Sequence, residues 1–388
     1  MRVLHVIPSL AARTGGPAVA AIEFARIATE QGIESAIYAT DAAFPAATRE
    51  GRAVETDELA QRASEVSVRL FPVRRPYRLS ASPKLREAIR ADARGFDVVH
   101  IHSLYLYPQR VAGKEARRHR IPYVVSPHGA LDPWLRRRGR GRKAVAELVW
   151  QRRLLRQAAA IHFTSEDEAR LAGTVAPGVP KEVVPLGIDW NEFQQLPPPA
   201  PFGDGPVVLS LGRLAAKKGL DSLIRAFAIA GRRFSDARLV IAGPDDEGLR
   251  PGLEALARQE GVGERVVFPG MLTGADKLAA LAAADVWALA SHTENFGIAV
   301  VEALAAGVPT LISPAVNLAG AIERAGAGIV SETRPELFAG AISYLLEDEG
   351  RRAGYAERGR AFARGYDWID LAPQIVQLYE QVARWARR

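Results

Sequence analysis

Short apolar runs alternate with longer amphipathic segments along almost the whole chain. The runs are apolar at both odd and even positions, which is typical of strands buried on both faces. We expect strands at Val3–Ile7, Ser35–Ala39, Val98–Ile101, Tyr123–Ser126, Ile161–Thr164, Val207–Leu211, Arg238–Ala242, Val266–Pro269, Val286–Ala290 and Pro309–Ile312. We expect helices between many of them, among others at Ala18–Gln31, Leu220–Arg232, Leu249–Gln259 and Lys277–Ala283. This alternation predicts an α/β fold with parallel sheets covered by helices on both faces.

Two domains are the default for a chain of 388 residues. The clearest linker is Leu196–Pro206, which contains three consecutive prolines and lies near the middle of the chain. A last amphipathic helix is expected at Trp368–Trp385. Its apolar stripe needs a partner surface, and the stripe consists of Leu371, Ile375, Leu378 and Val382.

Two local signals mark helix ends. Gly32 follows the first helical segment, where a residue in the left-handed region is favoured. Ser165 followed by Glu168 fits a capping box, so a helix is expected to begin directly after the strand Ile161–Thr164.

The composition limits which binding sites and which cellular locations we expect for the protein. The chain has no cysteine, which excludes disulfides and thiolate metal sites and suits a reducing cytoplasm. No apolar run reaches the ~18 residues of a membrane-spanning helix. The net charge of +7 is unevenly spread, because residues 1–200 carry +9 and residues 201–388 carry −2. The basic excess therefore belongs to the first half.

The densest basic segment is Arg136–Arg156, which also carries apolar residues. One interpretation is an interfacial amphipathic helix that contacts an anionic membrane surface or a phosphorylated acceptor. The other is a helix that buries its apolar side in the first domain while its arginines face solvent. Nucleic acid is not expected as a partner, because no recognisable binding module accompanies the charge. The apolar residues are Val145, Leu148, Val149, Trp150, Leu154 and Leu155.

Two basic or glycine-rich loops follow predicted strands. Gly15-Gly16, after the first strand, lets backbone N–H groups approach a ligand at the start of a helix, although a tight turn would also explain it. In the second half, Arg213 and Lys218 flank the loop after Val207–Leu211. Ligands bind α/β sheets at the carboxyl ends of strands, so these two cations form a candidate diphosphate clamp. A solvated basic loop is the alternative.

The strongest motif places Glu294 and Glu302 around the start of a predicted helix. Glu294 follows the strand Val286–Ala290, and a helix beginning near Gly297 would put Glu302 in its second turn. Both carboxylates can then accept hydrogen bonds from sugar or ribose hydroxyls. Donors for a phosphate come from the backbone N–H groups between them, those of Phe296, Gly297 and Ile298.

These motifs, in this order, resemble the GT-B glycosyltransferases of family GT4, over essentially the whole chain. Asn295 departs from the family's usual glycine and Leu186 from its usual asparagine, and both could tune which donor fits. The matching segments are Gly15-Gly16, Ser126-Pro127-His128-Gly129, Val184–Asp189, Gly212-Arg213 with Lys218-Gly219, Ile241–Pro244, Phe268–Gly270 and Glu294–Glu302.

The resemblance implies two Rossmann-like domains with a cleft between them. Residues 1–195, joined by a returning helix at 368–388, would bind the acceptor, and residues 205–367 would bind a nucleotide sugar. It implies retaining transfer without a metal, and the catalytic residues would be His128, Glu294, Arg213 and Lys218. His100 and His102 are expected to line the acceptor cleft or pack locally rather than to bind a metal. The donor-binding residues would be Gly15, Gly16, Arg213, Lys218, Asn295, Phe296, Gly297, Ile298, Glu302 and Met271.

The expected co-substrate is a nucleoside-diphosphate hexose, with a UDP-sugar favoured over a GDP-sugar, and no cofactor is expected. The expected acceptor is a saccharide or lipid-linked saccharide of envelope or exopolysaccharide synthesis, used by a cytoplasmic enzyme that can lie peripherally at the inner face of the membrane. The alternatives are a soluble small-molecule acceptor or a GT-B nucleotide-sugar epimerase, but no acid/base pair for epimerisation is evident. Neither half carries the full dinucleotide fingerprint of an oxidoreductase.

Overall fold

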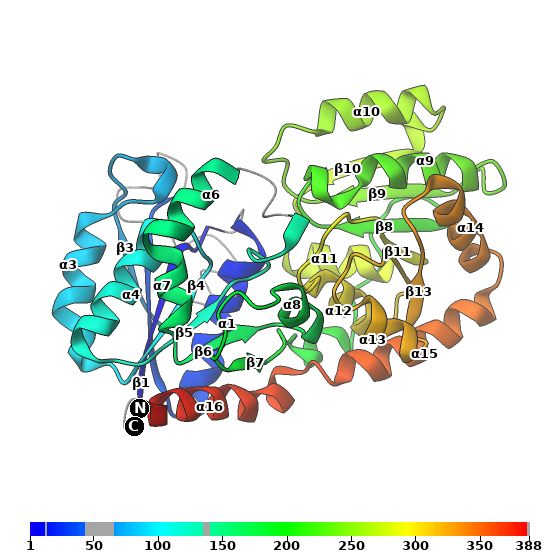
Figure 1. Cartoon of the computed structure of the whole chain (residues 1–388). Coiled ribbons are helices and arrows are strands. Elements are labelled where there is room, and N and C mark those ends of the chain that lie inside the picture. Colours follow the sequence, from blue (N-terminus) through cyan, green and yellow to red (C-terminus); the bar gives the residue numbers. More distant parts are fainter. Residues whose placement is uncertain (12–13, 43–65, 135–139, 386–388) are drawn as a thin grey trace. The chain divides into compact units, whose positions relative to one another are not determined.

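The computed structural model describes residues 1–11, 14–42, 66–134 and 140–385. The chain forms two compact units, Met1–Pro185 with Leu371–Arg388, and Leu186–Asp370 (Figure 1). The first unit ends ahead of the proline-rich segment Leu196–Pro206. This is because Ile188 pairs with Asp367 inside the second unit, and its N–H donates to the Tyr366 carbonyl oxygen at 2.8 Å.

The first unit is built on a seven-stranded sheet in the order β3-β2-β1-β4-β5-β6-β7, in which every neighbouring pair is parallel. The strands are β1 (Arg2–Ser9), β2 (Glu34–Thr40), β3 (Ser67–Phe71), β4 (Val98–His102), β5 (Tyr123–Ser126), β6 (Ala160–Phe163) and β7 (Lys181–Val183). The helices are α1 (Gly16–Glu30), α3 (Pro83–Asp92), α4 (Tyr107–His119), α6 (Arg140–Ala146), α7 (Arg152–Arg156), α8 (Glu166–Leu171) and most of α16 (Trp368–Trp385). Short helical turns lie at η3 (Tyr77–Leu79), η4 (Ala93–Gly95) and η5 (Glu147–Gln151).

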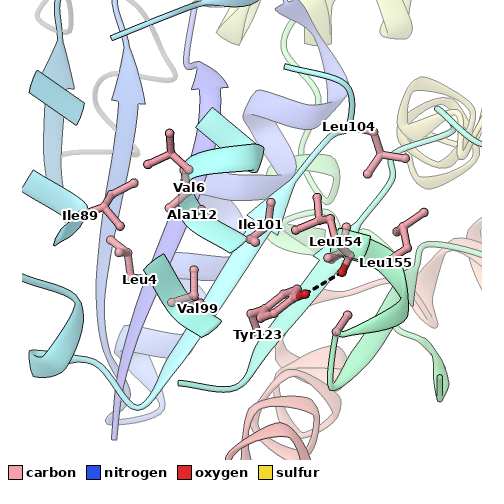
Figure 2. Close-up of a cluster of buried hydrophobic side chains, with 14 of the residues drawn as sticks. Leu4, Val6, Ile89, Val99, Ile101, Leu104, Ala112, Tyr123, Leu154 and Leu155 are labelled. Atoms are coloured by element: carbon pink, nitrogen blue, oxygen red, sulfur yellow. Dashed lines mark hydrogen bonds between the residues drawn. The ribbon is translucent and has the colours of Figure 1, made fainter. Parts of the chain in front are cut away.

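One face of this sheet forms the main apolar core of the unit. Leu4 and Val6 of β1, and Val99 and Ile101 of β4, pack there against α3, α4 and α7 (Figure 2). The Tyr123 hydroxyl reaches this core and donates to the Leu154 carbonyl oxygen at 2.7 Å. The odd and even positions of a strand point to opposite faces, so the intervening residues of these strands lie on the other side.

That other face carries histidines beside a smaller aliphatic cluster, in which Ile7 and Ile37 pack against Ile22 of α1. Phe24 of α1 and Tyr379 of α16 cover it, and their rings lie 5.9 and 5.8 Å from the ring of His100. Parallel register places His5 directly opposite His100 in the sheet. Four histidines are buried on this face, each no more than 1% exposed: His5, His100, His102 and His162.

The second unit contains a six-stranded parallel sheet in the order β10-β9-β8-β11-β12-β13. Its strands are β8 (Val207–Leu211), β9 (Arg238–Ala242), β10 (Val266–Gly270), β11 (Val286–Leu289), β12 (Thr310–Ile312) and β13 (Gly328–Val330). Its helices are α9 (Leu220–Ala230), α10 (Arg250–Gln259), α11 (Gly274–Ala282), α12 (Ile298–Ala305), α13 (Ala319–Arg324), α14 (Pro335–Leu346) and α15 (Glu349–Arg364). Short turns lie at η6 (Trp190–Phe193), η7 (Ala216–Lys218) and η8 (Gly263–Arg265).

The ten expected strands all form, most within one residue of their expected ends. Three further strands were not foreseen from the sequence: β3, β7 and β13. Each lies at the edge of its sheet and is only partly buried. An edge strand does not need apolar residues at both parities, so it leaves a weaker sequence signal.

Both helix-end signals are confirmed, and α8 begins at Glu166, directly after Ser165. Gly32 adopts a φ of 79°, as expected just after α1. The Ser165 hydroxyl accepts from the Glu168 N–H at 3.1 Å, which is the expected half of a capping box. The Glu168 carboxylate accepts from the N–H groups of Thr164 and Gly129.

Candidate functional site

A lysine–glutamate pair lies at the carboxyl ends of two adjacent strands of the second unit. The strands β8 and β11 pair in parallel, so the loops that follow them meet at one sheet edge. Lys218 Nζ donates to Glu294 Oε2 at 2.5 Å, and Lys217 Nζ lies 3.8 Å from the same oxygen. The lysine side chain is 14% exposed and the glutamate side chain 13%. The pair is therefore largely removed from water.

The backbone around Lys218 is held by close packing. Gly219 lies between the short turn η7 and α9, as the N-cap of α9, and has a φ of 60°. A Cβ at this position would lie 2.1 Å from the Ala290 carbonyl oxygen, so only glycine fits without displacing backbone. The His292 N–H donates to the Lys217 carbonyl oxygen at 2.7 Å, which ties the two loops together.

Glu294 is held as an anion. Burial acts to raise its pKa, but Lys218, Lys217 and Arg213 outweigh burial and lower the pKa of Glu294 to about 2. At neutral pH the carboxylate is thus ionised and acts only as an acceptor. Two of these cations, Arg213 and Lys218, were expected in the site from the sequence. The third, Lys217, is the neighbour of Lys218 along the chain.

Glu302 forms a second, separate pair. The helix α12 begins at Ile298 after Gly297, which has a φ of 81°, and Glu302 lies in its second turn as expected. Lys277 Nζ of α11 donates to Glu302 Oε1 at 2.9 Å, and the two side chains are 16% and 17% exposed. Sequence reasoning missed Lys277, because nothing along the chain relates it to a glutamate on another helix.

The loop between the two glutamates is anchored on both sides. The Glu294 N–H donates to Ala315 O at 3.0 Å, and the Asn317 N–H donates to Glu294 O at 3.1 Å. The Phe296 side chain is 2% exposed and packs edge-on against Tyr366, with ring centroids 5.8 Å apart. Phe296 therefore fixes the loop through its side chain, and only its backbone is left to face a ligand.

The other predicted donor residues lie in different surroundings. Met271 follows β10 and is 48% exposed. Gly15 precedes α1 with a φ of 73°, and the helix begins at Gly16. Gly15, Gly16 and His128 belong to the first compact unit, whereas Arg213, Lys218 and the residues 294–302 belong to the second.

The loop of His128 is strained and held by a buried carboxylate. His128 adopts a φ of 50° and Gly129 a φ of 78°, and left-handed backbone at a residue other than glycine is often found at functional sites. Glu168 Oε1 accepts from the Gly129 N–H at 2.7 Å, while its Oε2 accepts from the Thr164 N–H at 2.8 Å and from the Thr164 hydroxyl at 2.9 Å. Glu168 was foreseen as a cap but not as the support of this loop.

One set of buried side chains forms a hydrogen-bonded chain whose proton order is fixed. Burial lowers the pKa of His100 well below its usual value and that of His162 to about 4, so both rings are neutral. The Val184 carbonyl only accepts, so His162 Nε2 donates to it at 2.8 Å and His162 Nδ1 must accept from the Ser126 hydroxyl at 2.7 Å. Ser126 Oγ then accepts from His100 Nε2 at 2.6 Å, and His100 Nδ1 accepts from the Tyr379 hydroxyl at 2.8 Å.

A second chain starts at His128. His128 Nε2 lies 3.0 Å from His102 Nδ1, and His102 Nε2 lies 3.1 Å from His5 Nδ1. Burial lowers the pKa of His5 and of His128 to about 3 and that of His102 well below its usual value. All three rings are therefore neutral, and each ring carries one donor and one acceptor nitrogen.

The cluster of His5, His100 and His102 could also be considered as a metal site, since one ring nitrogen of each lies within 4.8 Å of the others. However, both nitrogens of His100 and both nitrogens of His102 already have hydrogen-bond partners. Binding an ion would break several of these bonds, so the arrangement favours hydrogen bonding over metal coordination.

Comparison with known proteins identifies the fold and the family. Residues 15–187 match the model of the glycosyl transferase 4-like domain, and residues 192–362 match glycosyl transferases group 1. The phosphatidyl-myo-inositol mannosyltransferase of Mycobacterium leprae is 30% identical over 334 residues, which cover 79% of each chain. The D-inositol 3-phosphate glycosyltransferase of Xylanimonas cellulosilytica is 28% identical over 320 residues, covering 74% of this chain and 73% of that protein.

Among solved structures, HepE of Anabaena in complex with UDP and glucose superposes with a TM-score of 0.79 at 20% identity, covering 98% of this chain and 99% of that one. The expected two Rossmann-like domains are confirmed by this likeness and by the two parallel sheets. The protein is therefore a glycosyltransferase enzyme and belongs to the GT4 family of GT-B glycosyltransferases.

Proposed function

We propose that this glycosyltransferase transfers a hexose, with retention of configuration, from a nucleoside-diphosphate sugar to an acceptor that carries phosphate. The observation that carries the proposal is the pair of Lys218 and Glu294 at the carboxyl edge of the second sheet. A carboxylate and several cations at the same loop edge suit a ligand that has both hydroxyl groups and a diphosphate.

In this proposal the cations act on the leaving group. Arg213 and Lys218 stabilise the negative charge that develops on the diphosphate as its bond to the sugar C1 breaks. The acceptor oxygen forms its bond to C1 on the same face, and its proton passes to the leaving phosphate oxygen. Glu294 accepts from sugar hydroxyls and Glu302 from ribose hydroxyls, while Lys277 keeps the Glu302 carboxylate in place.

The first half of the chain supports an anionic acceptor. Residues 1–200 carry the entire positive excess of the protein. Two of the relatives are named for acceptors that contain a phosphorylated inositol, one of them as a lipid. We therefore propose a phosphate-bearing polyol or saccharide, free or lipid-linked, as the acceptor class.

We also propose a peripheral membrane contact through the segment Arg136–Arg156, made by fewer apolar residues than the sequence suggested. Leu154 and Leu155 are core residues, 1% and 2% exposed, so they cannot insert into a bilayer (Figure 2). The apolar residues that remain available are Val145, Leu148 and Val149, which are 60%, 78% and 58% exposed.

These three residues neighbour the exposed arginines Arg152, Arg153 and Arg156 along the same helical segment. Arg136, Arg137 and Arg138 lie outside the described residues. No helix in the described ranges is long and apolar enough to span a bilayer. An apolar contact flanked by cations suits the surface of an anionic membrane at the cytoplasmic face.

The donor can be tested by incubating the protein with UDP-, GDP-, ADP- and dTDP-hexoses and measuring release of the nucleoside diphosphate. We expect one nucleotide to be favoured, with a UDP-hexose as the first candidate, and release to fall about 10²–10³-fold in Arg213→Ala. Arg225→Ala is the matched control, because Arg225 lies in the same unit on an exposed pair with Glu260. Equal release by both variants would remove Arg213 from the site.

The stereochemistry and the acceptor have their own readouts. The anomeric configuration of the product, determined by NMR, must equal that of the donor, and an inverted product would contradict retention. Inositol phosphate and phosphatidylinositol vesicles distinguish a soluble from a lipid acceptor. An unphosphorylated polyol used equally well would refute the proposed acceptor class.

Membrane contact can be measured by sedimentation with vesicles at low salt. We expect binding to phosphatidylglycerol vesicles but not to phosphatidylcholine vesicles, and loss of binding in the variant Leu148→Ser with Val149→Ser. Leu337→Ser is the control, because Leu337 is 41% exposed but lies in the second unit. Equal binding to both kinds of vesicle would exclude the electrostatic contact.

A further inference from the structure

The chain of His128, His102 and His5 has only two allowed proton orders. Each neutral imidazole carries a single N–H, so a donor on one ring fixes the donor on the next. In the first order all three rings carry the proton on Nε2, and His5 Nε2–H is the donor at the buried end. In the second order all three carry it on Nδ1, and His128 Nδ1–H is the donor at the outer end.

The buried end of the chain decides between these orders. His5 is 0% exposed, and its Nε2 has no hydrogen-bond partner among the residues that the structure describes. A buried N–H without an acceptor is rarer in proteins than an acceptor without a donor. The favoured order therefore leaves a bare acceptor at His5 Nε2 and places every proton on Nδ1.

The outer end of this hydrogen-bonded chain, at His128, is not fully buried. His128 is only partly buried, so solvent or a ligand can accept a hydrogen bond there. Its ring is held parallel to the ring of His102, with an interplanar angle of 7° and centroids 5.3 Å apart. Both the direction of the His128 ring and its proton thus depend on a neighbour that no ligand can reach, because His102 is 0% exposed.

We propose that His5 and His102 are positioning residues for His128, which fix its Nδ1–H tautomer so that it presents a hydrogen-bond donor to the ligand. His128 is then an electrostatic contact for an oxygen of the substrate and cannot act as a general base through Nδ1. The inference rests on the proposed function only for the statement that the ligand is a substrate.

The other hydrogen-bonded chain, which contains His100 and His162, serves as an internal control for the predicted tautomers. The Val184 carbonyl forces His100 and His162 to carry the proton on Nε2. The two chains share one sheet face but must differ in tautomer. Neutral imidazole in water prefers Nε2–H, so three buried rings with Nδ1–H would depart from the default in a way that burial alone does not explain.

The test is a long-range ¹H–¹⁵N correlation spectrum of protein labelled at histidine nitrogen, recorded near pH 7 without substrate. The chain has only 7 histidines, and single His→Gln variants assign the signals. We expect Nδ1–H patterns for His5, His102 and His128, and Nε2–H patterns for His100 and His162. An Nε2–H pattern for His128 in the unmodified protein would overturn the proposal, whatever the enzyme's activity.

Two isosteric variants at His5 test the coupling. The amide of His5→Asn can donate to His102 Nε2, so it should keep the Nδ1–H tautomer of His128. The carboxylate of His5→Asp can only accept, so it should reverse both His102 and His128 to Nε2–H. We expect kcat to fall about tenfold in His5→Asp, with little change in the donor KM and nearly normal kcat in His5→Asn.

A third variant and a metal titration complete the test. His102→Phe should release the His128 ring from its fixed tautomer and lower kcat. An unchanged His128 signal together with an unchanged kcat in His102→Phe would overturn the positioning role. Zinc added to the unmodified protein should leave the spectra unchanged. A joint shift of the His5, His100 and His102 signals would identify a metal site and overturn the proton order.

Discussion

Replacing Lys218 by methionine keeps an unbranched side chain of similar bulk and removes its charge. The lysine donates to Glu294 Oε2 at 2.5 Å in a region where each side chain is about one-seventh exposed. Without Lys218, the buried carboxylate keeps only Lys217, at 3.8 Å, and the more distant Arg213 as compensating charges. The pKa of Glu294 must therefore rise above its present value of about 2.

The magnitude follows from that pKa. A shift from 4.5 to about 2 corresponds to about 3 kcal/mol of stability at neutral pH, at about 1.4 kcal/mol per pH unit. Lys218 is the first of the cations that produce the shift, so we expect Lys218→Met to lose about 2 kcal/mol and about 4–8 °C in Tm. Turnover should fall about 10²–10³-fold, because one of the two cations proposed to stabilise the leaving group is gone.

The sign of the pH dependence provides the sharpest test. The folded-state pKa of Glu294 lies below its unfolded value of 4.5, so its contribution is complete above that pH and is lost as the pH falls towards 2. The difference in Tm between the unmodified protein and Lys218→Met should therefore be largest near pH 7 and shrink steadily below pH ~4.5. Thermal melts across this range and kcat with the preferred donor measure both effects.

Lys217→Met is the matched control, since Lys217 precedes Lys218 in the same turn but lies 3.8 Å from the carboxylate. It should lose less than half as much stability and much less activity. A Tm for Lys218→Met that equals that of the unmodified protein at pH 7, or a difference that grows on acidification, would refute the reasoning about the pair. Normal turnover would remove Lys218 from the donor site.

Three further substitutions test other parts of the molecule. Glu302→Ala should raise the donor KM or lower kcat at least about tenfold in steady-state kinetics, because hydrogen bonds to a charged group are lost. Gly219→Ala should lower the Tm by several degrees, because its Cβ would meet the Ala290 carbonyl oxygen at 2.1 Å. Tyr379→Phe should cost about 1–3 kcal/mol in denaturant unfolding, because it leaves the buried acceptor His100 Nδ1 without its donor.

Each substitution has a matched control. Glu336→Ala removes an exposed glutamate from the same unit, and equal kinetic losses would show that Glu302 has no special role. Gly32 also has a positive φ, but a Cβ added there would meet no atom within 4 Å. Gly32→Ala should therefore cost only the backbone strain, about 1 kcal/mol in the free energy of unfolding. Tyr344→Phe changes a 45% exposed tyrosine, and an equal loss there would contradict the buried role of Tyr379.

The sequence alone determined the sheet strands that are buried on both faces and the loops that follow them. Strands such as Tyr123–Ser126 and Arg238–Ala242 form at the expected residues, because a strand covered on both sides is mostly apolar at both odd and even positions. The order of motifs also pointed to the family that the comparisons confirm. The start of α12 at Ile298, and with it the place of Glu302, followed from Gly297.

Only the tertiary structure decided which of these loops meet. Lys218 reaches Glu294, 76 residues away, because β8 and β11 are neighbours in the sheet although β9 and β10 lie between them in the chain. Glu168 was expected at the start of its own helix, but only the adjacency of β5 and β6 brings its carboxylate to the His128 loop.

The two histidine chains show the same limit most clearly. The sequence places His5, His100, His102 and His162 on strands, but says neither that they share one face nor that α16 brings Tyr379 onto it. Strand order and parallel register bring the four rings together from segments far apart in the chain. Hydrogen bonds between such segments depend on how the strands and helices pack in three dimensions. The order of residue types along the chain does not show this packing.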